Sequence, residues 1–90
     1  MINEAILHDE RGGYNKADVL AKTDAYNVLL IALDEMKMSV SAINAELEKI
    51  RSMPMRRTKG FILSAKGFSV KETDDYIANL EQEIRSKIML

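Results

Sequence analysis

The sequence contains no cysteine and no tryptophan, and only one proline and one histidine among its 90 residues. Without cysteine, the chain has neither a disulfide framework nor a thiolate for catalysis or metal binding. No apolar run approaches the roughly 18 residues that a transmembrane helix needs. Glu4 stands where a signal peptide would carry positive charge. We therefore expect a cytoplasmic protein, either free or at the inner face of the membrane.

Catalytic chemistry has few of its usual residues in this chain. His8 is the only imidazole, and no serine lies in a Gly-x-Ser-x-Gly setting. Glu72, Asp74 and Asp75 have the composition of a metal site, but neighbouring helix positions point in different directions and no calcium-binding loop surrounds them. The glycines form no phosphate-binding string. We therefore predict a protein that is not an enzyme and that binds no cofactor or metal.

The length permits one small domain, residues 1–90. Such a short chain buries only about 60–65% of its unfolded surface, which favours a homo-oligomer, and a dimer in particular. The net charge of −1 conceals a strong segregation of charge. The stretch from Lys49 to Lys71 contains seven of the 13 basic residues and no acid, whereas acids flank it on both sides. This basic stretch is predicted to connect two more acidic helices.

A long amphipathic helix is predicted over residues 16–52. Nothing in this stretch breaks a helix, and Pro54 supplies a stop just beyond it. Its apolar residues recur at heptad spacing, interrupted only by Lys22, and this pattern favours a coiled coil. We predict that a dimer seam forms from eight residues: Tyr26, Leu29, Leu33, Met36, Val40, Ile43, Leu47 and Ile50.

A shorter second helix is predicted over residues 69–88. Val70, Ile77, Leu80 and Ile84 share one side of it. Residues 53–68 form a basic connector, long enough for this helix to fold back antiparallel, and residues 1–15 form an N-terminal segment and turn. The predicted fold is therefore all-α: a helical hairpin of a long coiled-coil-type helix and a shorter helix, assembling as a dimer.

The connector carries an apolar patch, residues 60–63, between basic residues. This pattern suits an anionic membrane surface, where each Lys or Arg adds about 1 kcal/mol of binding, or a small core beneath a solvated loop. A nucleic-acid-binding or regulatory helical protein would use the same residues on phosphates, but the sequence shows no zinc spacing and no helix-turn-helix signature. The candidates for contact with a partner protein or membrane are Arg56, Arg57, Lys59, Phe61 and Lys66.

One short motif occurs twice, at residues 13–19 and 67–73. Each copy has a glycine, an aromatic residue, a helix-capping residue and an acid three places after the cap. We expect each cap to accept a hydrogen bond from a first-turn amide and each acid to reach back toward the cap amide. Each glycine is expected to take a positive φ at a sharp turn, and each aromatic residue to pack on the first helical turn. The residues are Gly13, Tyr14, Asn15, Asp18 and Val19, then Gly67, Phe68, Ser69, Glu72 and Thr73.

The second copy and the residues after it resemble the N-terminal motif of the DivIVA family. Asp74 and Tyr76 match an acid and an aromatic residue of that motif, and Phe61, six places before Gly67, matches a further aromatic residue. The first copy fits through Val19 and then carries about four extra residues before Tyr26. Two features depart from the family: the exposed aromatic residue that precedes the glycine in membrane-binding members is missing, and typical members carry one copy.

The resemblance implies a dimeric bacterial scaffold of cell division, polar growth or envelope organisation. In that family a small lipid-binding domain precedes a parallel coiled coil, and the assembly recruits other proteins. We therefore predict a non-catalytic scaffold or adaptor that recruits partner proteins and touches anionic membrane. A plainer alternative is a structural helical hairpin without a ligand, within a longer chain.

Overall fold

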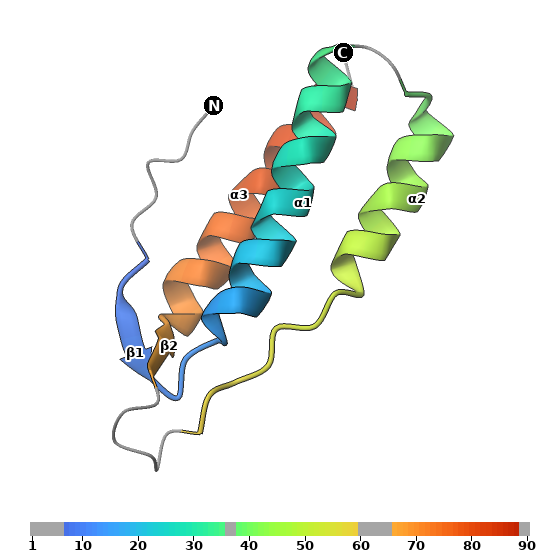
Figure 1. The fold of residues 1–90 in the computed structure, drawn as a ribbon. Coiled ribbons are helices and arrows are strands. Elements are labelled where there is room, and N and C mark those ends of the chain that lie inside the picture. The colour runs from blue at the N-terminus through green and yellow to red at the C-terminus, as the bar shows by residue number, and fades with distance from the viewer. Residues whose placement is uncertain (1–6, 36–37, 60–65, 89–90) are drawn as a thin grey trace.

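The computed structural model describes residues 7–35, 38–59 and 66–88. In these ranges the element order is β1 (Asp9–Arg11), α1 (Lys16–Asp34), α2 (Val40–Arg51), β2 (Lys66–Phe68) and α3 (Val70–Ile88). The mostly helical character expected from the sequence is confirmed. The antiparallel pair of β1 and β2 was not predicted. Figure 1 shows α1 between α3 and α2, with both strands at the end of the molecule where α1 and α3 begin.

The prediction of one continuous helix over residues 16–52 is wrong. α1 ends at Asp34, and α2 begins at Val40 and returns antiparallel beside α1 (Figure 1). Ser39 starts the new helix, because its hydroxyl oxygen accepts a hydrogen bond from the Ala42 amide at 3.1 Å. Good helix formers do not prevent the break, because packing of an amphipathic face outweighs local propensity.

The hydrophobic core lies among the three helices. It contains five of the eight residues predicted for the dimer seam, all at most 4% exposed: Tyr26, Leu29, Ile43, Leu47 and Ile50. Leu33 packs against the same cluster, Val40 is 52% exposed, and Met36 lies outside the described residues. The seam is therefore corrected: in this structure its heptad residues pack one helix against another within a single chain. Leu30, Leu80 and Ile84 complete the cluster.

α3 runs parallel to α1 and antiparallel to α2 (Figure 1). At the strand end, the Tyr14 hydroxyl donates a hydrogen bond to Asp74 at 2.9 Å. At the opposite end, Lys87 pairs with Asp34 at 2.7 Å. The last helix was predicted to run antiparallel to the helix before it. This is correct for α2 and wrong for α1.

None of the described helices is long and apolar enough to cross a membrane.

Hydrogen bonds to a single carboxylate, that of Glu81, join all three helices. The buried Tyr26 hydroxyl of α1 donates to Glu81 of α3 at 2.5 Å, and Arg51 of α2 donates to the same carboxylate at 2.8 Å. Burial raises the pKa of Tyr26, whereas hydrogen bonding from Arg51 lowers the pKa of Glu81. Lys22 has a structural role, because its ammonium donates to the carbonyls of Arg51 and Met53 at the end of α2.

Candidate functional site

The two motif copies lie against each other at the strand end of the molecule. The Tyr14 amide donates to the Phe68 carbonyl at 3.0 Å, and the Phe68 amide donates to the Tyr14 carbonyl at 2.9 Å. β1 and β2 extend this pairing, with Glu10 opposite Gly67. We call this unit, residues 8–19 with 56–58 and 66–73, the paired motif.

Glycine is required at both motif positions by close approach of the two backbones. A Cβ on Gly13 would overlap the Phe68 carbonyl, and a Cβ on Gly67 would overlap the Tyr14 carbonyl. The expected positive φ at these two glycines is wrong. Among the described glycines, the left-handed conformation belongs to Gly12, with φ of 71°.

The start of α1 is held by the segment that leads into the second motif. The Asn15 amide donates to the Arg56 carbonyl at 2.7 Å, and the Arg56 amide donates to the Asp18 carboxylate at 2.9 Å. Asn15 also caps the helix as predicted, accepting from the Asp18 amide at 3.0 Å. The acid does not reach back to the cap amide, because that amide already donates to Arg56.

The start of α3 is held in the same way by the segment that leads into the first motif. The Ser69 amide donates to the His8 carbonyl at 2.8 Å, and the His8 amide donates to the Glu72 carboxylate at 2.7 Å. Ser69 caps its helix as predicted, at 3.2 Å from the Glu72 amide. The bracing is therefore reciprocal: each half of the chain supplies the segment that fixes the helix start of the other.

The motif acids are electrostatically stabilised by these braces. Hydrogen bonds from the Arg56 side chain and backbone lower the pKa of Asp18 to about 2. Hydrogen bonds from the His8 backbone and ring lower the pKa of Glu72. Arg56 was expected to contact a partner or a membrane. It is instead engaged by Asp18, with its guanidinium 2.9 Å from the carboxylate.

The buried positions of α1 and α3 also match at the offset of the two motifs. Val19, Tyr26 and Leu30 in α1 correspond to Thr73, Leu80 and Ile84 in α3, and each pair has the sequence separation of Gly13 and Gly67. All six residues are at most 9% exposed. This ungapped alignment pairs Tyr26 with Leu80. The four extra residues expected before Tyr26 stay a prediction, because four residues are about one helical turn and leave the same face buried.

The remaining basic candidates have different environments. Arg57 donates to the Gly12 carbonyl at 2.5 Å, and its guanidinium lies 5.9 Å from the centre of the Tyr14 ring. Lys59 and Lys66 are exposed, and Lys66 stands opposite Arg11 in the register of the strand pair. Like charges in that position repel, so an anion beside them would be stabilising. Phe61 lies outside the described residues.

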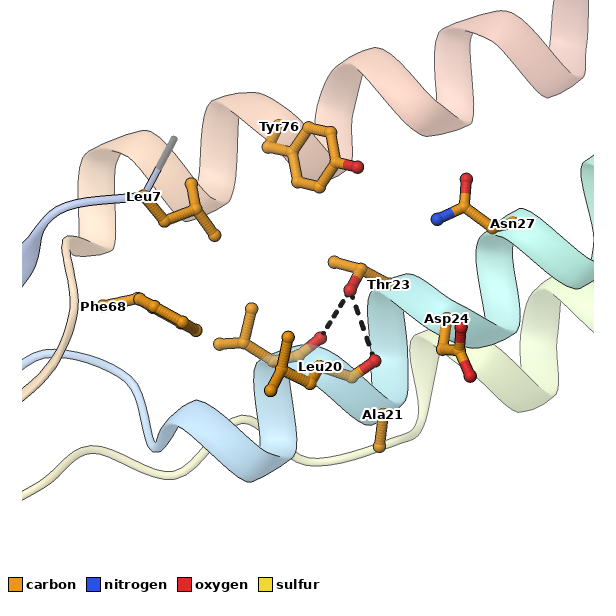
Figure 2. Close-up of a pocket in the computed structure, with 9 residues that line it drawn as sticks. Leu7, Leu20, Ala21, Thr23, Asp24, Asn27, Phe68 and Tyr76 are labelled. Carbon is orange, nitrogen blue, oxygen red and sulfur yellow. Dashed lines mark hydrogen bonds between the residues drawn. The ribbon is translucent and has the colours of Figure 1, made fainter. Parts of the chain in front are cut away.

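A groove of about 590 Å³ adjoins the paired motif between α1 and α3. Figure 2 shows Tyr76 reaching from α3 toward α1, with Leu7 and Phe68 at one end of the groove and Asn27 toward the other. The Thr23 hydroxyl in the lining is already bonded to the Val19 carbonyl at 2.9 Å. The lining combines apolar side chains with the polar groups of Asp24, Asn27 and Tyr76, and has few groups suited to chemical conversion.

The groove carries a free negative charge. Asp24 lines it and has no ion pair among the described residues. The basic residues of α1 do not neutralise it, because Lys16 pairs with Asp9 at 2.6 Å and Lys22 caps α2. Leu20, beside Asp24 in the lining, is 58% exposed. The site therefore offers apolar contact together with one available carboxylate.

Sequence reasoning missed the groove residues and the role of His8. Leu7, Leu20, Asp24 and Asn27 were not candidates, although Leu20 falls outside the heptad pattern and so had no explanation there. Nothing near His8 in the sequence indicates its contact with Glu72. The described residues contain no cluster of His, Asp or Glu that could hold a metal ion.

Comparison of the chain with protein-family models, curated proteins and solved structures finds no match.

Proposed function

We propose that this chain is a non-catalytic scaffold or adaptor that recruits a partner protein through the groove between α1 and α3. The observation that carries the proposal is the combination of apolar lining residues with the unpaired Asp24 carboxylate, placed beside the paired motif. The resemblance of the motif to the DivIVA family supports a scaffold of bacterial cell division or envelope growth. A homodimer belongs to the proposal, because so short a chain buries little surface alone.

The partner's chemistry follows from the lining. Leu7, Leu20, Phe68 and Tyr76 favour apolar side chains, whereas Asp24 favours an Arg or Lys beside them. α1 offers no competing cation, since both of its basic side chains are engaged within the molecule. The expected ligand is therefore a short protein segment that combines apolar residues with at least one basic residue.

Selection of peptides from a random display library on the intact protein tests this function. Enriched peptides should place a basic residue close to apolar ones. Their affinity should fall about tenfold for Asp24→Asn, because losing one charge-assisted hydrogen bond costs about 1.4 kcal/mol or more. Asp75→Asn is the matched control, since Asp75 is an exposed acid that does not line the groove. No enrichment, or equal binding to wild type and Asp24→Asn, would contradict the proposal.

A second candidate function is contact with an anionic surface. The specific observation is the exposed Arg11 and Lys66 pair, facing each other across the strands. Lipid headgroups at the inner face of a membrane and nucleic-acid phosphates share this chemistry. Flotation with anionic vesicles at low and high salt, with duplex DNA as competitor, distinguishes the two sources. Binding unchanged by Arg11→Ala with Lys66→Ala would exclude this surface.

A further inference from the structure

The turn between α1 and α2 lacks the residues that usually enforce a turn. Residues 35–39 read Glu-Met-Lys-Met-Ser, with no glycine or proline. Glu35 keeps helical dihedral angles, with φ −86° and ψ −2°, and its amide still donates to the Ile31 carbonyl at 3.1 Å. The Ser39 cap is the local signal for a new helix among the described residues. The hairpin is therefore held mainly by the packing of α2 on α1.

The contacts that hold the fold together join the chain before this turn to the chain after it. Before it lie β1, the first motif and α1; after it lie α2, β2, the second motif and α3. Asp18 meets Arg56, His8 meets Glu72, and Tyr14 pairs with Phe68 across this division. Tyr26 crosses it to Glu81. The chain therefore consists of two parts that pack against each other and are joined by the turn between α1 and α2.

We propose that two copies of this chain exchange the part from Val40 onward, forming a homodimer in which α1 of each chain packs on α2 and α3 of the other. In the exchange, α1 and α2 of one chain no longer lie side by side. Each contact across the division then forms between chains instead of within one. Such an exchange is a low-cost route to a dimer, since it reuses contacts that already exist.

The exchanged dimer also completes the groove from two chains. Leu20 and Asp24 come from the part before the turn, whereas Phe68 and Tyr76 come from the part after it. Each dimer therefore carries two paired motifs and two grooves. This arrangement would let the scaffold proposed above hold two partners at once. It deepens that proposal, but its geometry does not depend on what the groove binds.

The balance between monomer and exchanged dimer depends on the protein concentration and on the turn between α1 and α2. Within one chain the two pieces meet at the high effective concentration of a short tether, so the monomer dominates in dilute solution. Because α2 and α3 must detach before exchange, a dimer once formed should outlast dilution. Ser39→Ala removes the cap that favours the turn, and so should raise the dimer fraction.

A cysteine pair distinguishes exchange from simple surface association. Arg11 and Lys66 are cross-strand partners, and the chain has no native cysteine. The variant with Arg11→Cys and Lys66→Cys is unfolded, refolded at low and at about millimolar concentration, separated by size with light scattering, and then oxidised. The dimer peak should give chains joined covalently on a denaturing gel, whereas the monomer peak should give disulfides within single chains.

Two outcomes would overturn the exchange. One is a dimer whose disulfides all lie within single chains. The other is the absence of a dimer at every refolding concentration, for Ser39→Ala as well as for the native sequence. Neither outcome bears on peptide binding by the monomer, so failure of the exchange and failure of the proposed function are distinguishable.

Discussion

Asp18 and Glu72 occupy equivalent positions in the two motifs, and each is bound by a backbone amide from the other half of the chain. Both carboxyl pKa values are lowered, that of Asp18 to about 2. Each acid therefore links its motif to the segment from the other half of the chain that holds it. Each acid also interacts favourably with the positive end of its helix dipole.

Acid should weaken the fold through these two residues. Their folded-state pKa values lie below the unfolded values near 4, so their stabilisation is present above about pH 4 and is lost as pH falls toward 2. Urea unfolding measured from pH 7 to pH 2.5 should show the free energy of unfolding falling in that window. Asp18→Asn should reduce the fall, whereas Asp24→Asn, which removes an unpaired carboxyl, should keep it. A wild-type free energy that stays constant across the window would contradict the account.

Among individual residues, the sequence predicted the contacts between neighbours along the chain and missed those between residues far apart in it. Both caps are confirmed, because a cap and its first-turn amide lie within three residues of each other. The braces could not be predicted, since Arg56 is 38 residues from Asp18 and His8 is 64 residues from Glu72. The glycines were identified for the wrong reason: their role is backbone approach between the two copies, which a single copy cannot reveal.

The helices are joined by the hydrogen bond between Tyr26 and Glu81, with Arg51 on the same carboxylate. Tyr26→Phe keeps the buried ring and removes only the hydroxyl. Because Glu81 is charged and partly buried, the substitution should reduce the free energy of unfolding by about 1–2 kcal/mol in urea titration.

Tyr76→Phe is the matched control for this prediction. Tyr76 lines the groove, and its hydroxyl has no hydrogen-bond partner among the described residues. Its removal should change stability by less than about 0.5 kcal/mol. Equal effects of the two substitutions would mean that the contact among the three helices contributes nothing beyond ring burial.

The heptad pattern identified the apolar residues of these elements but not what they pack against. A hairpin within one chain and a coiled coil between chains require the same spacing, and the sequence between Asp34 and Val40 has no glycine or proline to separate them. Lys22, which interrupted the pattern, had a structural meaning: it caps α2. That role becomes visible only once the two helices lie side by side.

The whole molecule is elongated and thin, measuring 46 × 23 × 15 Å along its principal axes. Leu20, Val28 and Ile31 of α1 are each more than half exposed. Apolar exposure on this scale fits a molecule that acts with partners, either a recruited protein in the groove or a second copy.

The two motif copies form one reciprocal unit, in which each copy holds the other in place. Hydrogen exchange of backbone amides, followed by NMR in the wild type and in Gly67→Ala, tests it most directly. The added methyl group would overlap the Tyr14 carbonyl. Exchange should therefore accelerate at Tyr14 and Asn15 in the first copy as much as at Phe68 and Ser69 in the second. Acceleration confined to residues 66–69, with the first copy still protected, would contradict the claim.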